Sequence, residues 1–238
     1  AVGLTGAKIV FCDISKDNLC LCPDELKKKI NKRTKAVIYV TLNGRSGYIN
    51  KIKDVCNKNK IHLIEDSAHS IGSYFKNKHH GNFGIASSFS FSAPKIITTG
   101  QGGMIVTNSS KIYKKIKKIK NFGRITDGND FYESIGYNFK FTDLQASLGI
   151  SQFNSLNKHI ENKRKLNKTY KKINNPNFEI GEFQENELPW FFDLYSKSKP
   201  KLKKLSKILT EKGIETRNLY PALSKQKYLK NFRKTNLE

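Results

Sequence analysis

Residues 36–66 read AVIYVTLNGRSGYINKIKDVCNKNKIHLIED and contain the clearest fold pattern of the chain. Its first residues, Ala36–Val40, form a continuous apolar run, which is typical of a strand buried on both faces of a sheet. Residues 52–59 have a helical pattern, and residues 61–66 form a second apolar run that ends in two acidic residues. Strand, helix and strand at this spacing predict a parallel α/β sheet.

The segments on either side extend this pattern. We expect a strand at residues 8–13 and a helix that opens at Pro23, because acidic residues fill the turn after the proline. Two further strands are expected at residues 86–91 and 103–107. Residues 111–120 place apolar residues at helical spacing among lysines, which predicts an amphipathic helix with a solvated basic face.

The second half of the chain indicates a change of architecture. A long helix is expected over residues 142–173, with Thr142 as its N-cap and Gln145 at the capping-box position. The sequence NNPN at residues 174–177 breaks this helix. A strand over residues 190–195 and a helix over residues 200–212 then predict a small α+β domain. We therefore divide the chain into a large domain at residues 1–141, a linking helix at residues 142–174 and a small domain at residues 175–238.

Composition limits the classes of partner. The 238 residues carry a net charge of +24, which could indicate nucleic-acid binding. However, only six of the 44 basic residues are arginine, the residue that base edges and bidentate phosphate contacts favour. The lysines are also spread along the chain, so we expect a folded basic enzyme with no nucleic-acid partner. No apolar run approaches the roughly 20 residues of a membrane helix, so no membrane partner is expected.

The cysteines and the chain ends favour a cytoplasmic fragment. Four cysteines lie in the first quarter of the chain, and their spacing lacks the paired pattern of a zinc site. We interpret them as small, partly buried residues in a reducing cytoplasm, and we expect no metal. The start does not resemble a signal peptide. It also lacks an initiator Met, and the chain stops without a closing element, so a fragment is expected.

Two polar groups follow the second strand of the opening stretch. Open α/β sheets bind ligands at the carboxyl ends of their strands, where Asp66 lies. Its carboxylate could pair with a ligand cation, and His69 could reach the same ligand. Acids are nevertheless common at strand ends. On these residues alone a structural role is favoured, with Asp66 capping the turn and His69 a satisfied polar residue.

A second polar constellation surrounds Lys95. Residues 89–103 read FSFSAPKIITTGQGG, so an aromatic strand leads into serine, proline, threonine and glycine. Pro94 biases its predecessor to an extended conformation, and the glycines allow close backbone approach. Burial in such a turn would lower the pKa of the lysine and make its amine nucleophilic, as Schiff-base chemistry requires. A structural lysine that binds phosphate or backbone is an equally good interpretation of these residues.

Motifs along essentially the whole chain decide between these alternatives. Together they resemble the DegT/DnrJ/EryC1/StrS family, whose members use pyridoxal 5'-phosphate (PLP) and act on nucleotide-linked sugars. The segments that carry the resemblance are GAKIVFCD at 6–13, IEDSAH at 64–69, GNFG at 81–84, FSF at 89–91, Lys95, TTGQGGM at 98–104, GYNFKFTDLQA at 136–146, GIETR at 213–217 and YPALSKQ at 220–226.

The resemblance implies a fold and a role for each site residue. The fold is α/β, the PLP-dependent transferase fold type I, with a mostly parallel central sheet, helices on both faces and a small α+β C-terminal domain. Lys95 would hold PLP as a Schiff base and later move protons at the substrate carbon. Asp66 would pair with the pyridine nitrogen, and His69 would lie near the phenolic oxygen. Ser90 would bind the phosphate, and Asn138 would reach the phosphate in the neighbouring subunit of a homodimer with shared active sites.

The resemblance also implies an activity. The family's aminotransferases move an amino group, usually from glutamate, to a keto group of a nucleotide-linked deoxysugar for surface polysaccharide or related glycan synthesis. A branch that dehydrates sugars has histidine in place of Lys95, and residues 89–104 lean towards perosamine-synthase-like members. Gly84-Ile85 and Gln101 depart from the frequent Gly-Asp and Glu, which affects local packing rather than PLP binding.

A second hypothesis remains open from the sequence. Family members carry an N-terminal portion that supplies a backbone cradle for the phosphate and an aromatic residue stacked on the ring, and we expect this portion to be missing here. The missing portion and the charge of +24 support an alternative, in which the protein is a non-catalytic truncated chain or a basic binding protein without PLP turnover.

Overall fold

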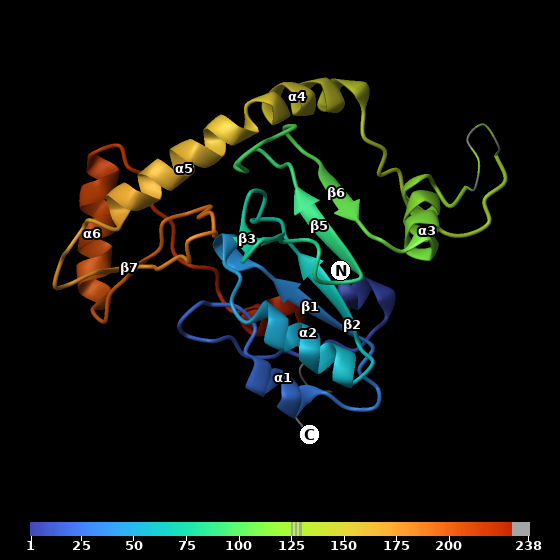
Figure 1. The fold of residues 1–238 in the computed structure, drawn as a ribbon, viewed down its shortest axis with the longest axis horizontal. Coiled ribbons are helices and arrows are strands. Elements are labelled where there is room, and N and C mark those ends of the chain that lie inside the picture. Colours follow the sequence, from blue (N-terminus) through green and yellow to red (C-terminus); the bar gives the residue numbers. More distant parts are fainter. Residues whose placement is uncertain (125, 127, 129, 230–238) are drawn as a thin grey trace.

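The computed structural model describes residues 1–124, 126, 128 and 130–229, and a four-stranded sheet forms its centre (Figure 1). The first three strands in spatial order are parallel and the last is antiparallel to its neighbour. This confirms the expected α/β fold and adds one antiparallel edge. The strands in spatial order are β1 (Ala36–Val40), β2 (His62–Asp66), β5 (Ala86–Ser90) and β6 (Gly103–Val106).

Six α-helices in the described part of the chain surround or flank this sheet. In sequence order they are α1 (Pro23–Lys29), α2 (Ile49–Lys58), α3 (Ser110–Lys120), α4 (Asp143–Asn154), α5 (Leu156–Tyr170) and α6 (Lys199–Glu211). Two short hairpins are formed by β3 (Tyr74–Phe75) with β4 (Lys78–His79), and by β7 (Glu179–Ile180) with β8 (Leu194–Tyr195). The 3-10 turns are η1 (Val2–Thr5), η2 (Leu42–Gly44), η3 (Leu223–Lys225) and η4 (Lys227–Leu229).

The hydrophobic core lies between helices α1 and α2 and one face of the sheet. Tyr39 of β1, Ile52 of α2 and Leu63 of β2 belong to this buried cluster. Burial alternates along β1, because Ile38 and Val40 on the other face are 42% and 39% exposed. The expectation that this strand is buried on both faces is therefore wrong. Within the described residues its second face stays partly open.

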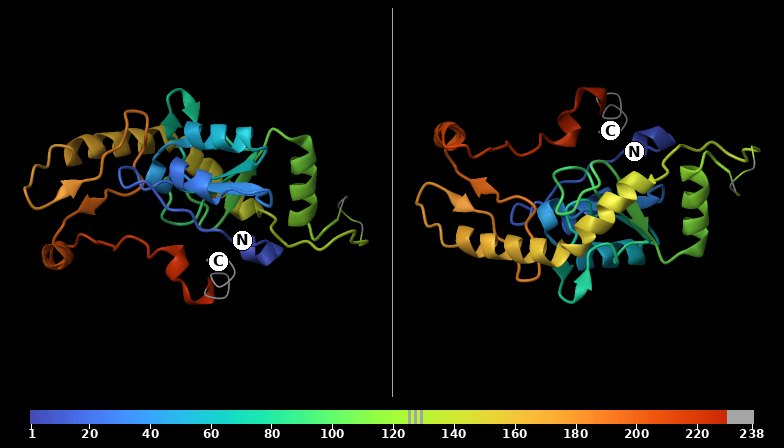
Figure 2. Two further views of the ribbon diagram at one scale, coloured as in Figure 1. Left: turned by 90° about the horizontal axis from the view of Figure 1, so that it is seen from below. Right: turned by 90° about the horizontal axis from the view of Figure 1, so that it is seen from above.

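Helices α4 and α5 run end to end along one side of the sheet, with α3 and α6 at opposite ends of the molecule (Figures 1 and 2). The capping box between Thr142 and Gln145 at the start of α4 is confirmed. The single long helix expected here is wrong, however, because it divides at Ser155. The N–H of Ser155 bonds to Gln152, three residues back, and this tight turn ends α4.

Two other expectations differ from the structure. Residues 8–13 form no strand, and the nearest pairing is an isolated bridge between Ile14 and Leu21. A strand needs a neighbouring strand for its hydrogen bonds, and the apolar pattern of these residues does not indicate whether one is present. The strand expected at residues 190–195 is confined to Leu194–Tyr195, because the residues before it bond to the loop after β1 instead.

Residues 182–193 are anchored to that loop by buried charged groups. The Glu187 carboxylate accepts the backbone N–H of Ser46 at 2.6 Å. The guanidinium of Arg45 lies 2.6 Å from the carboxylate of Asp193 as a close ion pair, and Arg45 is buried. Long-range contacts thus bring a segment from the second half of the chain to the edge of the sheet.

Gly44 permits this close approach. Its φ is +85°, and a Cβ at this position would lie 2.0 Å from the carbonyl oxygen of Leu188. Only glycine accepts both the backbone angle and the proximity. The division into a large domain, a linking helix and a small domain stays a prediction, and residues 230–238 of that small domain lie outside the described residues.

Candidate active site

The carboxyl ends of β2 and β5 bring two polar residues to one edge of the sheet. These parallel strands are neighbours in a register that pairs Asp66 with Ser88. Asp66 is the last residue of β2, and Ser90 is the last residue of β5. Such an edge is where open α/β sheets bind ligands. One oxygen of Asp66 accepts the N–H of Ala68 at 3.2 Å, and within the described residues its other oxygen makes no hydrogen bond.

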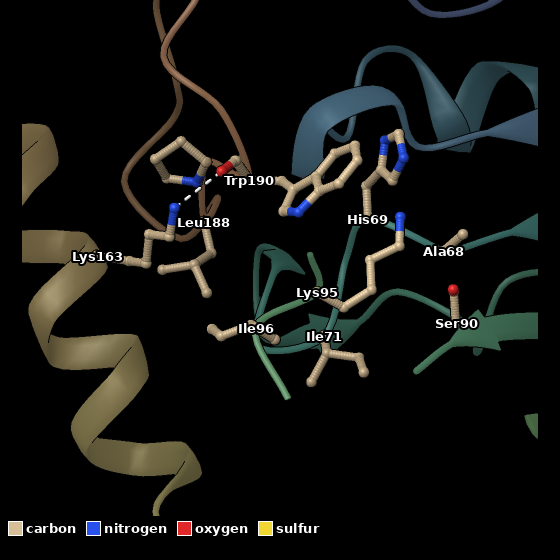
Figure 3. A pocket seen from close by; sticks show the side chains of 10 residues that line it. Ala68, His69, Ile71, Ser90, Lys95, Ile96, Lys163, Leu188 and Trp190 are labelled. Atoms are coloured by element: carbon tan, nitrogen blue, oxygen red, sulfur yellow. Dashed lines mark hydrogen bonds between the residues drawn. The ribbon is translucent and has the colours of Figure 1, made fainter. Parts of the chain in front are cut away.

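Lys95 extends from the turn after β5 into a narrow pocket at this edge (Figure 3). The turn is fixed locally, because the N–H of Lys95 bonds to the carbonyl of Ser92 at 3.0 Å. The side chain is half-buried. The residues that line the pocket are Ala68, His69, Ile71, Ser90, Lys95, Ile96, Lys163, Leu188, Pro189 and Trp190.

The pKa of Lys95 is lowered from its ordinary value by burial, and the carboxylate of Asp66 opposes that shift. Burial penalises the ammonium form, so a larger share of the amine is neutral at a given pH than on an exposed lysine. A neutral amine is the nucleophile that carbonyl chemistry needs. Burial in this pocket therefore favours the neutral amine of Lys95, and Asp66 limits that effect.

His69 is held as a neutral imidazole beside Lys95. Its Nδ1 accepts the backbone N–H of Asn43 at 3.2 Å, which leaves the proton on Nε2. Burial and the nearby charge of Lys95 lower the pKa of His69 to about 4. The ring can therefore donate one hydrogen bond from Nε2 at neutral pH.

Two pocket residues were missed from the sequence, namely Trp190 and Lys163. The Trp190 ring centroid lies 3.7 Å from Nζ of Lys95 and 3.9 Å from the ring centroid of His69. Lys163 of α5 donates from Nζ to the carbonyl of Trp190 at 2.8 Å, and burial lowers its pKa. No local pattern marks either residue. The one signal is that Trp190 is the only tryptophan in the chain.

The residues at this edge fit the chemical groups of PLP. A partly buried lysine amine with a lowered pKa suits the aldehyde, and a carboxylate with one oxygen free of described hydrogen bonds suits the ring nitrogen. The hydroxyls of Ser90 and Ser92 lie 3.0 Å apart, and such donors suit a phosphate. The structure thus brings together four of the five predicted site residues, which are Asp66, His69, Ser90 and Lys95.

Asn138 lies outside this group. It is exposed in the loop before α4, where it forms an isolated bridge with Asn121, and it does not line the pocket. Its predicted role concerns the active site of a neighbouring subunit, which a single chain does not test.

The second acidic residue of β2, Glu65, has a structural role. It is fully buried, and its carboxylate accepts the backbone N–H groups of Gly81, Phe83 and Gly84 at 2.8, 2.6 and 2.7 Å. Glu65 therefore shapes the loop before β5. Asp66, the next residue along the strand, faces the other way because side chains alternate.

Other site types have little support among the described residues. None of the described His, Cys, Asp and Glu side chains gather in groups of three or more as metal ligands would. The four cysteines are free thiols, with Cys20 and Cys56 buried. In the described part of the chain, the helices are too short or too polar to cross a bilayer.

Comparison with known proteins identifies the family of the chain. The model of the DegT/DnrJ/EryC1/StrS aminotransferase family matches residues 1–237. GDP-perosamine synthase of Escherichia coli O157:H7 is 30% identical over 237 residues, which cover 98% of this chain and 65% of that protein.

Solved structures show the same fold. Helicobacter pylori PseC, an aminotransferase involved in the biosynthesis of pseudoaminic acid, superposes with a TM-score of 0.89 at 28% identity, covering 97% of this chain and 64% of that one. E. coli GDP-4-keto-6-deoxy-D-mannose-3-dehydratase with bound hydrated PLP gives a TM-score of 0.82 at 26% identity, covering 91% and 61%. The chain thus spans less than two thirds of the length of these relatives. From the family match over residues 1–237, the chain belongs to the DegT/DnrJ/EryC1/StrS aminotransferase family.

Proposed function

We propose that the protein is a PLP-dependent aminotransferase that acts on a nucleotide-linked deoxysugar. The observation that carries this proposal is the half-buried amine of Lys95, which shares one pocket with His69 and Ser90 and lies within electrostatic range of Asp66. The relatives point to the same chemistry, because one is named a perosamine synthase and one solved structure contains PLP.

Each site residue has a defined task in this proposal. When bound, PLP supplies an electron-accepting ring. Lys95 would attach the cofactor through its amine, with release of water, and would then move a proton at the reacting carbon of the substrate. Asp66 holds a proton at the ring nitrogen through its free carboxylate oxygen. Ser90 donates its hydroxyl to the phosphate. His69, neutral at pH 7, donates from Nε2 to the cofactor's phenolic oxygen.

The name of one relative, GDP-perosamine synthase, supports a keto group on a GDP-linked deoxysugar as the acceptor. We propose glutamate as the amino donor, because the family's aminotransferases usually use it. A role in surface polysaccharide or related glycan synthesis fits such a product. The four free cysteines support a cytoplasmic location, where thiols stay reduced.

A homodimer completes the proposal. Large apolar side chains lie exposed on the loop before α4 and on α4 itself, with Ile135 87% and Leu144 82% exposed. Exposed apolar side chains on neighbouring segments favour an interaction site. Asn138 lies in this same loop, so docking of a second copy here fits its proposed role at the partner's phosphate.

The proposal is tested with the purified chain, PLP, glutamate and a GDP-linked 4-keto-6-deoxyhexose. Mass spectrometry should detect the amino sugar, and 2-oxoglutarate should form in equal amount. Lys95→Ala should abolish both products, whereas Lys114→Ala, on the exposed face of α3, should leave them unchanged. Turnover by Lys95→Ala at the wild-type rate would overturn the proposal, as would binding of nucleic acid with no detectable PLP binding.

A further inference from the structure

Trp190 lies in the pocket although nothing in the proposed chemistry requires it. Its indole ring contacts two of the proposed site residues, with Nζ of Lys95 3.7 Å from the ring centroid and His69 at 3.9 Å between centroids (Figure 3). An ammonium at this distance from an indole face is attracted by the ring quadrupole, and tryptophan is the strongest partner for this contact. A neutral amine gains much less.

The position of the ring is fixed from several directions. Its Nε1 donates to the carbonyl of Pro94 at 2.8 Å, one residue before Lys95. The N–H of Trp190 bonds to the carbonyl of Asn43 at 3.3 Å, and its carbonyl accepts Nζ of Lys163. The ring is therefore held over Lys95 by contacts to the lysine's own turn, to the loop after β1 and to α5.

We propose that Trp190 is a positioning residue that holds the ammonium of Lys95 on its indole face and thereby controls when this amine is free to react. The effect of this contact on PLP binding rests on the proposed function, because the amine of Lys95 is the group that would bind PLP. The contact itself belongs to the chain without any ligand, so it can be tested separately.

Other charged or titratable groups face Lys95 and act beside the indole. Asp66 at the end of β2 favours the ammonium, as Trp190 does. His69, neutral at pH 7, adds no charge there. Lys163 from α5 lines the same pocket, and a second ammonium would disfavour the first. Removing the indole should therefore shift the protonation equilibrium of Lys95 towards the neutral amine.

The test measures the ionisation of Lys95 without PLP. The full chain is labelled with trace acetic anhydride across a pH series, and mass spectrometry follows acetylation of the Lys95 peptide. Exposed Lys114 serves as internal standard for the reagent, and circular dichroism verifies folding at each pH. In Trp190→Leu the midpoint should fall by about one pH unit, in line with a lost cation–π contact. Trp190→Phe keeps an aromatic face, so its acetylation midpoint should lie closer to that of the wild type than to that of Trp190→Leu.

A second measurement needs no change at Trp190. Because the chain has one tryptophan, selectively excited tryptophan fluorescence reports on the surroundings of Trp190, and the Lys95→Met variant identifies the part that is due to Lys95. Wild-type emission should titrate with the same midpoint as Lys95 acetylation, and this transition should be absent in Lys95→Met. An unchanged acetylation midpoint in Trp190→Leu, or an emission transition that persists in Lys95→Met, would overturn the proposal. Neither result depends on aminotransferase activity, so the proposed function could fail while this inference holds.

Discussion

The backbone N–H of Asn43 donates to Nδ1 of His69 across 3.2 Å. Asn43 has a left-handed backbone (φ +57°), and its side chain bonds to both the N–H and the carbonyl of Phe191. One buried residue thus fixes the tautomer of His69 and anchors the segment that carries Trp190.

This relationship predicts two separable effects at position 43. Asn43→Gly keeps the positive φ but loses the side-chain bonds, so it should lower the unfolding free energy by about 1–2 kcal/mol. Asn43→Ala should cost about 1 kcal/mol more, because alanine disfavours this backbone angle. Urea unfolding measures both, with Asn57→Ala on the exposed side of α2 as control. Equal stability of Asn43→Gly and wild type would show that the side chain anchors nothing.

Histidine burial predicts acid sensitivity. His80 is fully buried, and burial with a contribution from His79 lowers its pKa to about 4. The unfolded chain therefore binds a proton before the folded chain does, and stability should fall as pH drops from about 6.5 towards 4. The contribution of His80 over this window is about 2–3 kcal/mol. Urea unfolding at several pH values gives the unfolding free energy as a function of pH. This free energy should fall less steeply towards acid pH in His80→Gln than in the wild type. His62→Gln, at an exposed position, is the control and should follow the wild type.

The carboxylate of Glu65 should be a major source of local stability. Glu65→Gln leaves one oxygen for three backbone N–H groups and turns an NH₂ towards them. We expect thermal and urea unfolding to show a loss of about 2–4 kcal/mol. Glu161→Gln, on the exposed side of α5, should change stability by no more than about 0.5 kcal/mol. A similar small effect for Glu65→Gln would contradict this role.

The buried ion pair between Arg45 and Asp193 predicts a non-additive pair of changes. Asp193→Leu leaves the Arg45 guanidinium buried without its counter-charge and should cost about 3–5 kcal/mol. Replacing both residues, by Arg45→Met with Asp193→Leu, removes the unpaired charge and should cost less than the single change. A double-mutant cycle in urea measures the coupling. Additive losses would mean that the two charges act independently.

The sequence predicted those parts of the fold that depend on local patterns. The run from Ala36 to Asp66 has its own periodicity, so the β1, α2 and β2 elements were recovered within a few residues. The strand expected at residues 8–13 is wrong, because an apolar pattern does not determine whether a neighbouring strand is available for pairing. The break at Ser155 was missed because the residues around it are all compatible with a helix.

The site shows the same distinction. Asp66, Ser90 and Lys95 sit at strand ends or in the turn beside them, where local sequence fixes their place. Trp190 and Lys163 reach the pocket only because residues 182–193 dock on the loop after β1. Contacts over more than 90 residues of chain, such as that between Trp190 and Pro94, leave no periodic signal.

The covalent attachment point of PLP shows whether Lys95 is the lysine that holds the cofactor. The purified chain is incubated with PLP, reduced with borohydride and digested, and the peptides are mapped by mass spectrometry. We expect the pyridoxyl-phosphate mass on the peptide that contains Lys95, none on the Lys163 peptide from the same pocket, and loss of the adduct in Lys95→Ala. An adduct on Lys163, or unchanged labelling in Lys95→Ala, would contradict it.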